Sequence, residues 1–170
     1  MGVPALLACV VAGLTLPDID QPLPLDHRSA LTHGILPAAA LAALRWARAA
    51  AAGLALGIGL HLAADLFPDA MIGYATVAVP FGGRLDAGQS YLWLGGNALA
   101  CALVGLWLLH RSVPHAGLKA AALLGAAAIG LWYLPRVDGG WPALLLLVGA
   151  GWLMLRRRLP ADAQSATSRP

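Results

Sequence analysis

The chain has 170 residues, of which 59% are hydrophobic and only 11% charged, whereas about 25% are charged in an ordinary soluble domain. This composition, with a mean hydropathy of +0.73, excludes an ordinary water-facing surface and indicates that lipid surrounds much of the chain. The formal net charge is +3, but no basic stripe with interleaved aromatic residues accompanies it, so we do not expect direct binding of nucleic acid.

Six apolar segments follow one another along the chain. They cover residues 3–16, 31–46, 49–67, 91–109, 118–134 and 142–155. The first and last are short for a membrane span, so five spans are the alternative to six. Because backbone groups cannot stay unpaired in hydrocarbon, and no segment alternates as a barrel strand does, we predict an all-α fold. The expected architecture is a polytopic transmembrane helical bundle of about six helices, forming a single domain over residues 1–159, with a disordered polar tail over residues 160–170.

The first apolar segment ends in the motif LPDID, which carries Asp18 and Asp20. The segment has no basic residue before it, so we do not expect a cleaved signal peptide. Pro17 stops the first helix, and two carboxylates separated by one residue can turn toward a common centre if the loop kinks. The alternative is a helix end with two solvated acids.

The motif DHRSALTH contains His27 and His33. Ser29 is a candidate N-cap, which predicts that the second helix begins there, with His33 in its first turn and His27 in the loop before it. Two imidazoles can then converge from loop and helix. The alternative is that each histidine is a cap or an interfacial group. The neighbouring side chains expected to fix the histidine tautomers by hydrogen bonding are Asp26, Arg28 and Thr32.

The third apolar segment places four residues, each four positions apart, on one helical face. They are Gly53, Gly57, His61 and Asp65. The two glycines allow a neighbouring helix to approach closely, and the same face carries the polar pair of the motif HLAAD into the bundle. An ionisable residue inside a span costs several kcal/mol unless it is paired or binds something, which favours a functional site. The alternative is a hydrogen bond between His61 and Asp65 that only joins helices.

Residues 68–90 contain Pro80, Gly82 and Gly83, which predicts a long loop or re-entrant segment between helices three and four, acting as a lid. Arg84 in this segment is either a phosphate ligand or a solvated arginine. The two other histidines, His110 and His115, lie after the fourth apolar segment, a membrane thickness away from the motifs, and we interpret them as interfacial residues.

The charges are distributed unequally between the two ends of the predicted spans. The end opposite the motifs carries seven basic residues, namely Arg45, Arg48, Arg111, Lys119 and Arg156, Arg157 and Arg158. The positive-inside rule then predicts that both termini are cytoplasmic. The motifs face outward across a bacterial cytoplasmic membrane, where seven of the eight acidic residues also lie.

Three imidazoles and three carboxylates suit a divalent metal, with Zn²⁺ expected, Mn²⁺ or Fe²⁺ as alternatives, and one or two ions bound. The predicted ligands are Asp18, Asp20, His27, His33, His61 and Asp65. A metal there can lower the pKa of bound water to about 7 and polarise an ester or phosphoryl oxygen, as hydrolysis requires. A carboxylate that stays off the metal can act as the general base, and Asp20 and Asp65 are the candidates.

The order and spacing of LPDID, HRSALTH, GLHLAAD and VPFGGR resemble the YdjM-like family of inner-membrane proteins, predicted metal-dependent hydrolases also described as LexA-binding. The resemblance covers about the first half of the chain. It implies a helical membrane protein in which the same six residues are metal ligands. It also implies that a protein partner is possible. Relatives carry a histidine in the first helix, whereas this chain has none before His27.

We therefore expect an integral-membrane hydrolase that acts on a lipid or lipid-linked ester or phosphoester, because a site at the lipid boundary favours substrates that arrive through the bilayer. A metal-binding scaffold or regulatory partner without turnover is the first alternative. A small transporter with an Asp/His ion site is the second. Transport is disfavoured because the later apolar segments offer almost no polar residue besides Asn97 to continue a path across the membrane.

Overall fold

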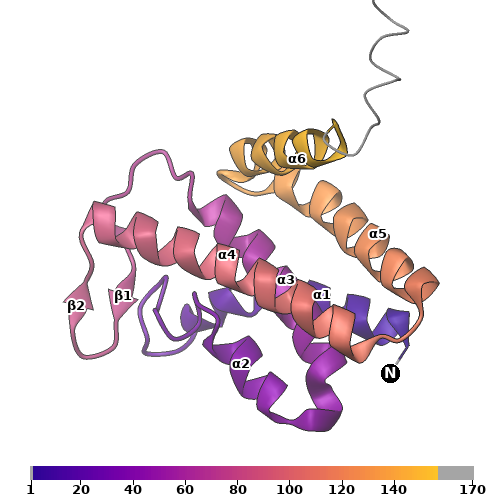
Figure 1. The fold of residues 1–170 in the computed structure, drawn as a ribbon. Coiled ribbons are helices and arrows are strands. Elements are labelled where there is room, and N and C mark those ends of the chain that lie inside the picture. The colour runs from indigo at the N-terminus through magenta and orange to yellow at the C-terminus, as the bar shows by residue number, and fades with distance from the viewer. Residues whose placement is uncertain (1, 157–170) are drawn as a thin grey trace, which may run out of the picture.

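A computed structural model describes residues 2–156 and contains six α-helices in that range (Figure 1). The helices are α1 (Val3–Thr15), α2 (Leu36–Ala43), α3 (Arg48–Asp65), α4 (Ala87–Ser112), α5 (Ala116–Tyr133) and α6 (Gly140–Arg156). Two-residue strands β1 (Ala78–Val79) and β2 (Gly83–Arg84) form an antiparallel hairpin, and 3₁₀ turns occur at η1 (Pro17–Asp20), η2 (Arg45–Ala47), η3 (Gly73–Ala75) and η4 (Leu134–Arg136). The mostly helical fold is confirmed. The tail predicted over residues 160–170 lies outside the described residues.

Helix α3 forms the centre of the structure, because it contacts every other α-helix within residues 2–156. Among the described residues, three segments are long and apolar enough to cross a membrane, namely Arg45–Asp65, Ala87–Ser112 and Ala116–Arg136. The first is 72% buried over its apolar window, against 28% and 22% for the other two. Helices α4 and α5 thus direct many apolar side chains outward, as expected where lipid replaces water as the solvent.

The glycine face of α3 packs against the backbone of α1. A Cβ atom at Gly57 would overlap the carbonyl oxygen of Val10, and one at Gly53 would overlap that of Leu6. Gly13 of α1 meets the carbonyl oxygen of Leu54 in the same way. The predicted role of this face as a close helix contact is therefore confirmed, and the contact brings the C-terminal turn of α1 beside the polar end of α3.

Helix α2 differs from its prediction, because it begins at Leu36 and not at Ser29. Residues 29–33 instead form a single turn, closed by hydrogen bonds from the Thr32 and His33 amides to the Ser29 carbonyl. The turn does not continue as a helix, since α2 starts only where Pro37 sets the backbone of its first turn. Eight residues extend about 12 Å, which is too short to cross a hydrocarbon core of about 30 Å.

Helix α4 begins earlier than the apolar pattern indicates, at Ala87 in place of residue 91. Asp86 accepts a hydrogen bond from the Gln89 amide while the Gln89 side chain accepts one from the Asp86 amide. This capping box was overlooked in the sequence, where the polar residues 86–90 were assigned to the loop. The reciprocal bonds account for a helix start four residues before the apolar run.

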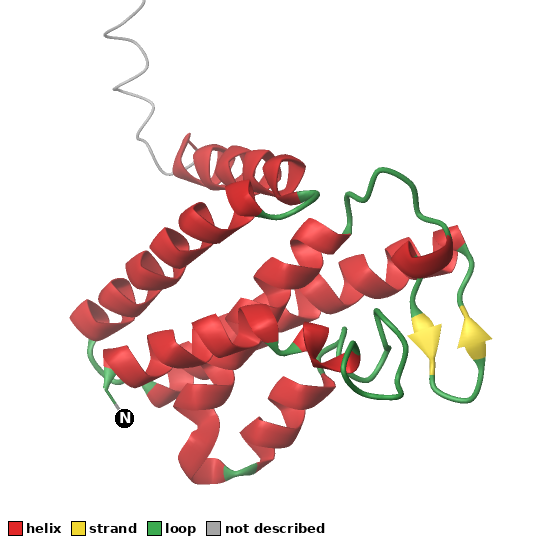
Figure 2. Cartoon of the chain, turned by 180° about the vertical axis from the view of Figure 1, so that it is seen from behind, coloured by secondary structure: helices red, strands yellow, loops and turns green. Residues whose placement is uncertain are grey.

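The β1–β2 hairpin is fastened to the loop that carries the histidines (Figure 2). The Ala78 amide donates to the Arg28 carbonyl at 2.9 Å, and the Ala30 amide donates to the Ala78 carbonyl at 2.8 Å. Arg84 adds hydrogen bonds to the carbonyls of His27 and Tyr74. The segment predicted as a lid therefore includes a strand that pairs with the site loop, and Arg84 joins these backbones.

A single methyl group at the α1–α3 contact tests whether it holds the fold together. We expect Gly57→Ala to lower the free energy of unfolding by about 1–3 kcal/mol, because the new Cβ must displace the α1 backbone. Thermal unfolding in detergent measures the change.

Gly96→Ala is the matched control, because a Cβ there meets no atom within 4 Å. It should unfold at the wild-type temperature or slightly above, since Ala favours a helix over Gly. Equal stability of the two variants would contradict a close α1–α3 contact.

Candidate metal centre

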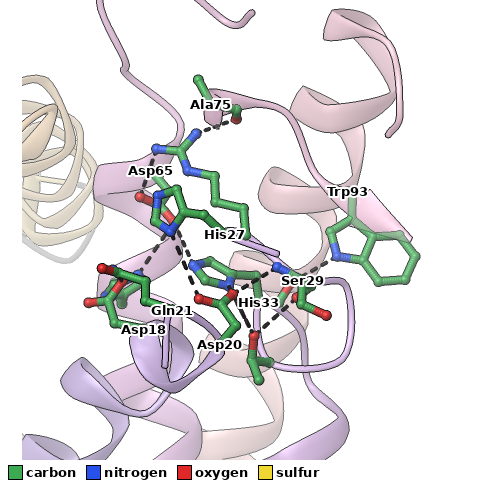
Figure 3. Close-up of polar contacts among 12 residues, drawn as sticks. Asp18, Asp20, Gln21, His27, Ser29, His33, Asp65, Ala75 and Trp93 are labelled. Carbon is green, nitrogen blue, oxygen red and sulfur yellow. Dashed lines mark hydrogen bonds and ion pairs between the residues drawn. The ribbon is translucent and has the colours of Figure 1, made fainter. Parts of the chain in front are cut away.

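The six predicted ligands come from three places in the fold and meet beside the C-terminal end of α3 (Figure 3). Turn η1 carries Asp18 and Asp20, the following loop carries His27 and His33, and the last turns of α3 carry His61 and Asp65. Figure 3 shows the labelled side chains of this group turned toward one another. The sequence prediction that these motifs converge is met in the described structure, while their role as ligands stays a prediction.

His61 presents one ring nitrogen to the centre because its other ring nitrogen is held by the backbone. Its Nδ1 lies 2.9 Å from the carbonyl oxygen of Leu14. A carbonyl can only accept, so Nδ1 must carry the proton, and Nε2 of the neutral ring then has a free lone pair. The hydroxyl of Tyr133, on α5, also lies 3.1 Å from Nδ1. The close α1–α3 contact thus selects the tautomer that suits metal binding.

His33 is oriented in the same way by a carboxylate. Its Nδ1 lies 3.0 Å from Oδ2 of Asp20, and both side chains are fully buried. An ionised carboxylate accepts a proton donor, so Nδ1 carries the hydrogen and Nε2 keeps a lone pair. The ring centroids of His33 and His61 are 5.3 Å apart. Two imidazoles of defined tautomer therefore face one another across a small polar space.

Asp65 supplies an oxygen at the same point. Arg28 donates from Nη2 to Oδ1 of Asp65 at 2.9 Å, and its Nη1 bonds to the Ala75 carbonyl. The second oxygen, Oδ2, lies 3.4 Å from Nε2 of both His33 and His61. Ligand atoms around a tetrahedral Zn²⁺ at about 2.0–2.2 Å are roughly 3.3–3.6 Å apart. Atoms at this spacing can surround one ion or the water bound to it.

Asp18 lies on the open side of the group. Its side chain is 44% exposed, and its Oδ1 is 3.9 Å from Nε2 of His61. One ligand atom each from Asp18, His33 and His61 all lie within 4.8 Å of one another. These three residues could together hold a metal ion.

Buried polar atoms without a hydrogen-bond partner are concentrated at this group. Within the described residues they are His33 Nε2, His61 Nε2, Asp65 Oδ2, Asp20 Oδ1, His27 Nδ1 and Arg28 Nε. A buried polar group without a partner costs about 1–3 kcal/mol, and more if it is charged. Five of these six atoms belong to predicted ligands. A cation beside His33 Nε2, His61 Nε2 and Asp65 Oδ2 would satisfy these three, which lie close together. The donor set of imidazole nitrogen and carboxylate oxygen suits Zn²⁺.

Asp20 serves mainly to hold the site loop. Its Oδ2 accepts from the Ser29 amide at 2.8 Å, from Thr32 Oγ1 at 3.0 Å, and from His33. Burial favours protonation of this carboxyl, but the hydrogen bonds from His33, Ser29 and Thr32 outweigh it and lower the pKa of Asp20. Asp20 is thus ionised at neutral pH, as its role as acceptor for His33 requires. Of the three side chains expected to fix the histidine tautomers, Thr32 lies 3.2 Å from His33 Nδ1, whereas Arg28 bonds to Asp65. In the part of the chain that the structure describes, the exposed Asp26 makes no such contact.

His27 lies at the edge of the group. Its Nδ1 is 3.8 Å from the free Oδ1 of Asp20, and its ring centroid is 6.0 Å from that of His33. Burial lowers the pKa of His27 by more than the nearby Asp20 raises it. The ring is therefore neutral at pH 7, which is the form able to bind a metal. His27 and Asp20 offer two further ligand atoms beside the first group.

Two contributors to the centre were not identified from the sequence. Tyr133 lies 72 positions after His61 and belongs to an apolar run, and the Leu14 carbonyl is a backbone group. Neither has a local signal, because both act only through helix packing. His110, in contrast, bonds to Lys119 on the exposed side of the distant helix ends, as its assignment away from the site predicts.

Comparisons of the chain with family models, with curated proteins and with solved structures found no match. The resemblance to the YdjM-like family stays a prediction.

Metal content tests the centre directly. We expect His33→Ala and His61→Ala to reduce the zinc that copurifies with the protein to about a tenth of the wild-type content or less, because each removes a lone pair that faces the ion. Asp20→Asn keeps Asp18, His33 and His61 but weakens the hold on His33, so it should lower zinc affinity by about 10- to 100-fold. Elemental analysis of purified protein and competition with a zinc indicator give these values.

His110→Ala is the control, since it makes the same change on an exposed histidine at the other end of the helices. It should keep the wild-type zinc content. Equal loss from all three histidine variants, or no zinc in the wild type after growth with added zinc, would count against this centre.

Proposed function

We propose that the chain is an integral-membrane, metal-dependent hydrolase that acts on a lipid or lipid-linked ester or phosphoester at the outer face of a bacterial cytoplasmic membrane. The observation that carries the proposal is the set of unpartnered atoms at His33 Nε2, His61 Nε2 and Asp65 Oδ2, next to a half-exposed Asp18. Catalytic zinc sites use three protein ligands and leave one position for water or substrate. An arrangement with one exposed edge suits that pattern better than a closed structural site.

In the proposed mechanism, different residues of the cluster bind the metal and transfer the proton. Asp18, His33 and His61 hold one divalent ion, with Zn²⁺ the best match to the donors and Mn²⁺ or Fe²⁺ as alternatives. The bound metal would supply an activated water and a polarised substrate oxygen. A second ion would use the free atoms of Asp20 and His27, which are 3.8 Å apart.

Asp65 is the proposed general base. Arg28 fixes one of its oxygens, while Oδ2 remains free and lies 3.4 Å from both imidazoles. It is therefore positioned to accept a proton from a water held at the same point. Asp20, the other candidate from the sequence, is fully buried and uses Oδ2 for three donors. Its proposed role is to position His33.

The depth of the cluster supports a lipid substrate. His61 lies one turn before the end of α3, about 6 Å along the helix from Asp65. Helix α1 ends beside His61, since the Leu14 carbonyl contacts its ring. The proposed centre thus lies below the end of a candidate span, where a lipid headgroup region would adjoin it.

The proposed orientation follows from charge. Arg45, Arg48, Arg111 and Lys119 lie at the ends of the candidate spans away from the cluster. The positive-inside rule assigns that end to the cytoplasm and the cluster to the outer face. In the proposed topology the chain crosses the membrane several times and both termini are cytoplasmic. The short helices α1 and α2 then meet the cluster within the membrane, which explains why they are shorter than α3.

Hydrolysis of lipid esters and phosphoesters by protein in nanodiscs tests the activity. We expect a chelator to abolish turnover, added Zn²⁺ to restore it, and His61→Ala to be inactive. Asp65→Asn should lower kcat by about 100-fold or more while keeping the metal, because it removes the base. His110→Ala should retain full activity. Loss of metal from Asp65→Asn would make this residue a ligand in place of the base.

A bound metal without turnover on any ester or phosphoester tested would reject the hydrolase and favour the alternative of a non-catalytic metal-binding scaffold or regulatory partner.

Labelling of single cysteines tests the orientation. In a background with Cys9 and Cys101 changed to Ala, we expect Ala70→Cys, on the exposed loop after α3, to react with a membrane-impermeant maleimide in intact spheroplasts. Ala43→Cys, at the exposed end of α2, should react only after lysis. The reverse pattern would place the cluster on the cytoplasmic face.

A further inference from the structure

The tip of the β1–β2 hairpin has an unusual backbone conformation for its sequence. The Val79 carbonyl accepts a hydrogen bond from the Gly82 amide at 2.9 Å, which closes a four-residue turn. Pro80 is the second residue of this turn, and Phe81 is the third, with φ at 61°. Proline followed by a positive φ defines a type II turn, whose third residue is usually glycine. The hairpin thus holds a bulky aromatic residue in a conformation that its side chain disfavours.

The Phe81 side chain is fully exposed, so no described part of the chain covers its ring. Ile72 and Tyr74, earlier in the same loop, are also largely exposed. Figure 2 shows the hairpin standing out from the helices at the edge of the molecule. A single exposed apolar residue needs no explanation, but this ring is combined with an unfavourable turn conformation. Surroundings that stabilise the ring outside the protein would offset both costs.

The position of the hairpin in the chain indicates what those surroundings are. It follows the candidate span Arg45–Asp65 and precedes the candidate span Ala87–Ser112, and Figure 1 shows it beside the first turns of α4. Phe81 lies five positions before Asp86, the N-cap of α4, which is at most about 18 Å along the chain. Outward apolar side chains begin on α4 with the exposed Leu92. In the membrane topology proposed above, the tip is therefore held within reach of the outer headgroup region.

Two other partners suit the ring less well than lipid does. The first is the metal cluster, with the hairpin closing over it. Ala78 opposes this closure, because its backbone bonds to Arg28 and Ala30 of the site loop and holds β1 in place. The second is a docked protein. A stable interface buries about 800 Å² on each partner, whereas one aromatic side chain buries about 150–250 Å². Insertion into a bilayer has no such requirement, since lipid surrounds a single side chain on all sides.

We propose that the hairpin tip inserts Phe81 into the outer-leaflet interface of the membrane. Aromatic side chains are common at this depth, where an apolar face can reach the boundary of the acyl chains. The hydrogen bonds of Ala78 to the site loop connect the inserted tip to the segment between His27 and His33. The insertion rests on the proposed membrane topology and does not require hydrolysis.

Photo-crosslinking from the tip tests the insertion without any turnover. The photoreactive aromatic residue p-benzoylphenylalanine replaces Phe81 in the full chain, which is reconstituted in phospholipid nanodiscs and irradiated. Mass spectrometry then measures the fraction of protein that carries a phospholipid adduct. We expect at least about three times as much adduct as from the same replacement at Ala70, an exposed position earlier in the loop.

The same replacement at Leu124 separates the insertion from the proposed topology, because Leu124 is exposed on α5 within the candidate span Ala116–Arg136. Lipid adducts at Leu124, together with no more adduct at Phe81 than at Ala70, would overturn the insertion and leave the topology standing. Crosslinks from Phe81 to protein in place of lipid would also overturn it. No lipid adduct at either Leu124 or Phe81 would reject the topology and the insertion together.

Phe81→Gly tests the exposed ring apart from folding. Glycine suits the positive φ of this turn, so the variant should unfold in detergent at the wild-type temperature or above and keep the wild-type zinc content. A lower temperature would mean that the ring packs within the fold, and it would contradict the proposal. Lipid adducts at Phe81 in a protein that hydrolyses no ester would leave the insertion standing and reject the hydrolase. If both proposals hold, Phe81→Gly should raise KM for membrane lipid about threefold or more and leave KM for a water-soluble ester unchanged.

Discussion

Two hydrogen bonds donated by histidine Nδ1 atoms determine which nitrogen atoms of the polar cluster can bind a metal. The Leu14 carbonyl accepts from His61, and the Asp20 carboxylate accepts from His33. Neither acceptor can donate in its usual state, so each fixes the proton on Nδ1 and leaves a lone pair on Nε2. Both lone pairs then face the free oxygen of Asp65. Without a proton or cation between them, three acceptors would be buried together without a donor, which the low dielectric of the interior makes costly.

These two bonds depend on different parts of the fold. The first requires the backbone of α1 to lie almost against α3, which glycine at positions 13, 53 and 57 permits. The second requires the turn at residues 29–33 to stay bound to Asp20, and the hairpin supports that turn from the other side through Ala78. Helix packing and loop structure thus converge on one point, although they act on different histidines.

The convergence of the motifs was predictable because each motif places ionisable residues at the end of an otherwise apolar segment. Gly53, Gly57, His61 and Asp65 repeat every four residues, and helical geometry then dictates a common face. The start of α2 was not predictable in the same way. Ser29 has the chemistry of an N-cap, but its amide is bound by Asp20, nine positions earlier, and this nonlocal bond stabilises a turn in place of a helix. The contacts of Tyr133 and the Leu14 carbonyl with His61 were not predicted for a similar reason, since only packing between helices brings these groups together. The cap at Asp86 is local and was within reach of sequence reasoning.

X-ray absorption at the zinc edge tests the central claim most directly, because it reports the atoms bound to the ion. The account predicts a first shell of nitrogen and oxygen at about 2.0–2.2 Å with outer scattering from two imidazoles, or three if His27 also binds. A His33→Ala and His61→Ala double variant should bind too little zinc to give this signal. Sulfur at about 2.3 Å, or a shell of oxygen alone in the wild-type protein, would contradict it.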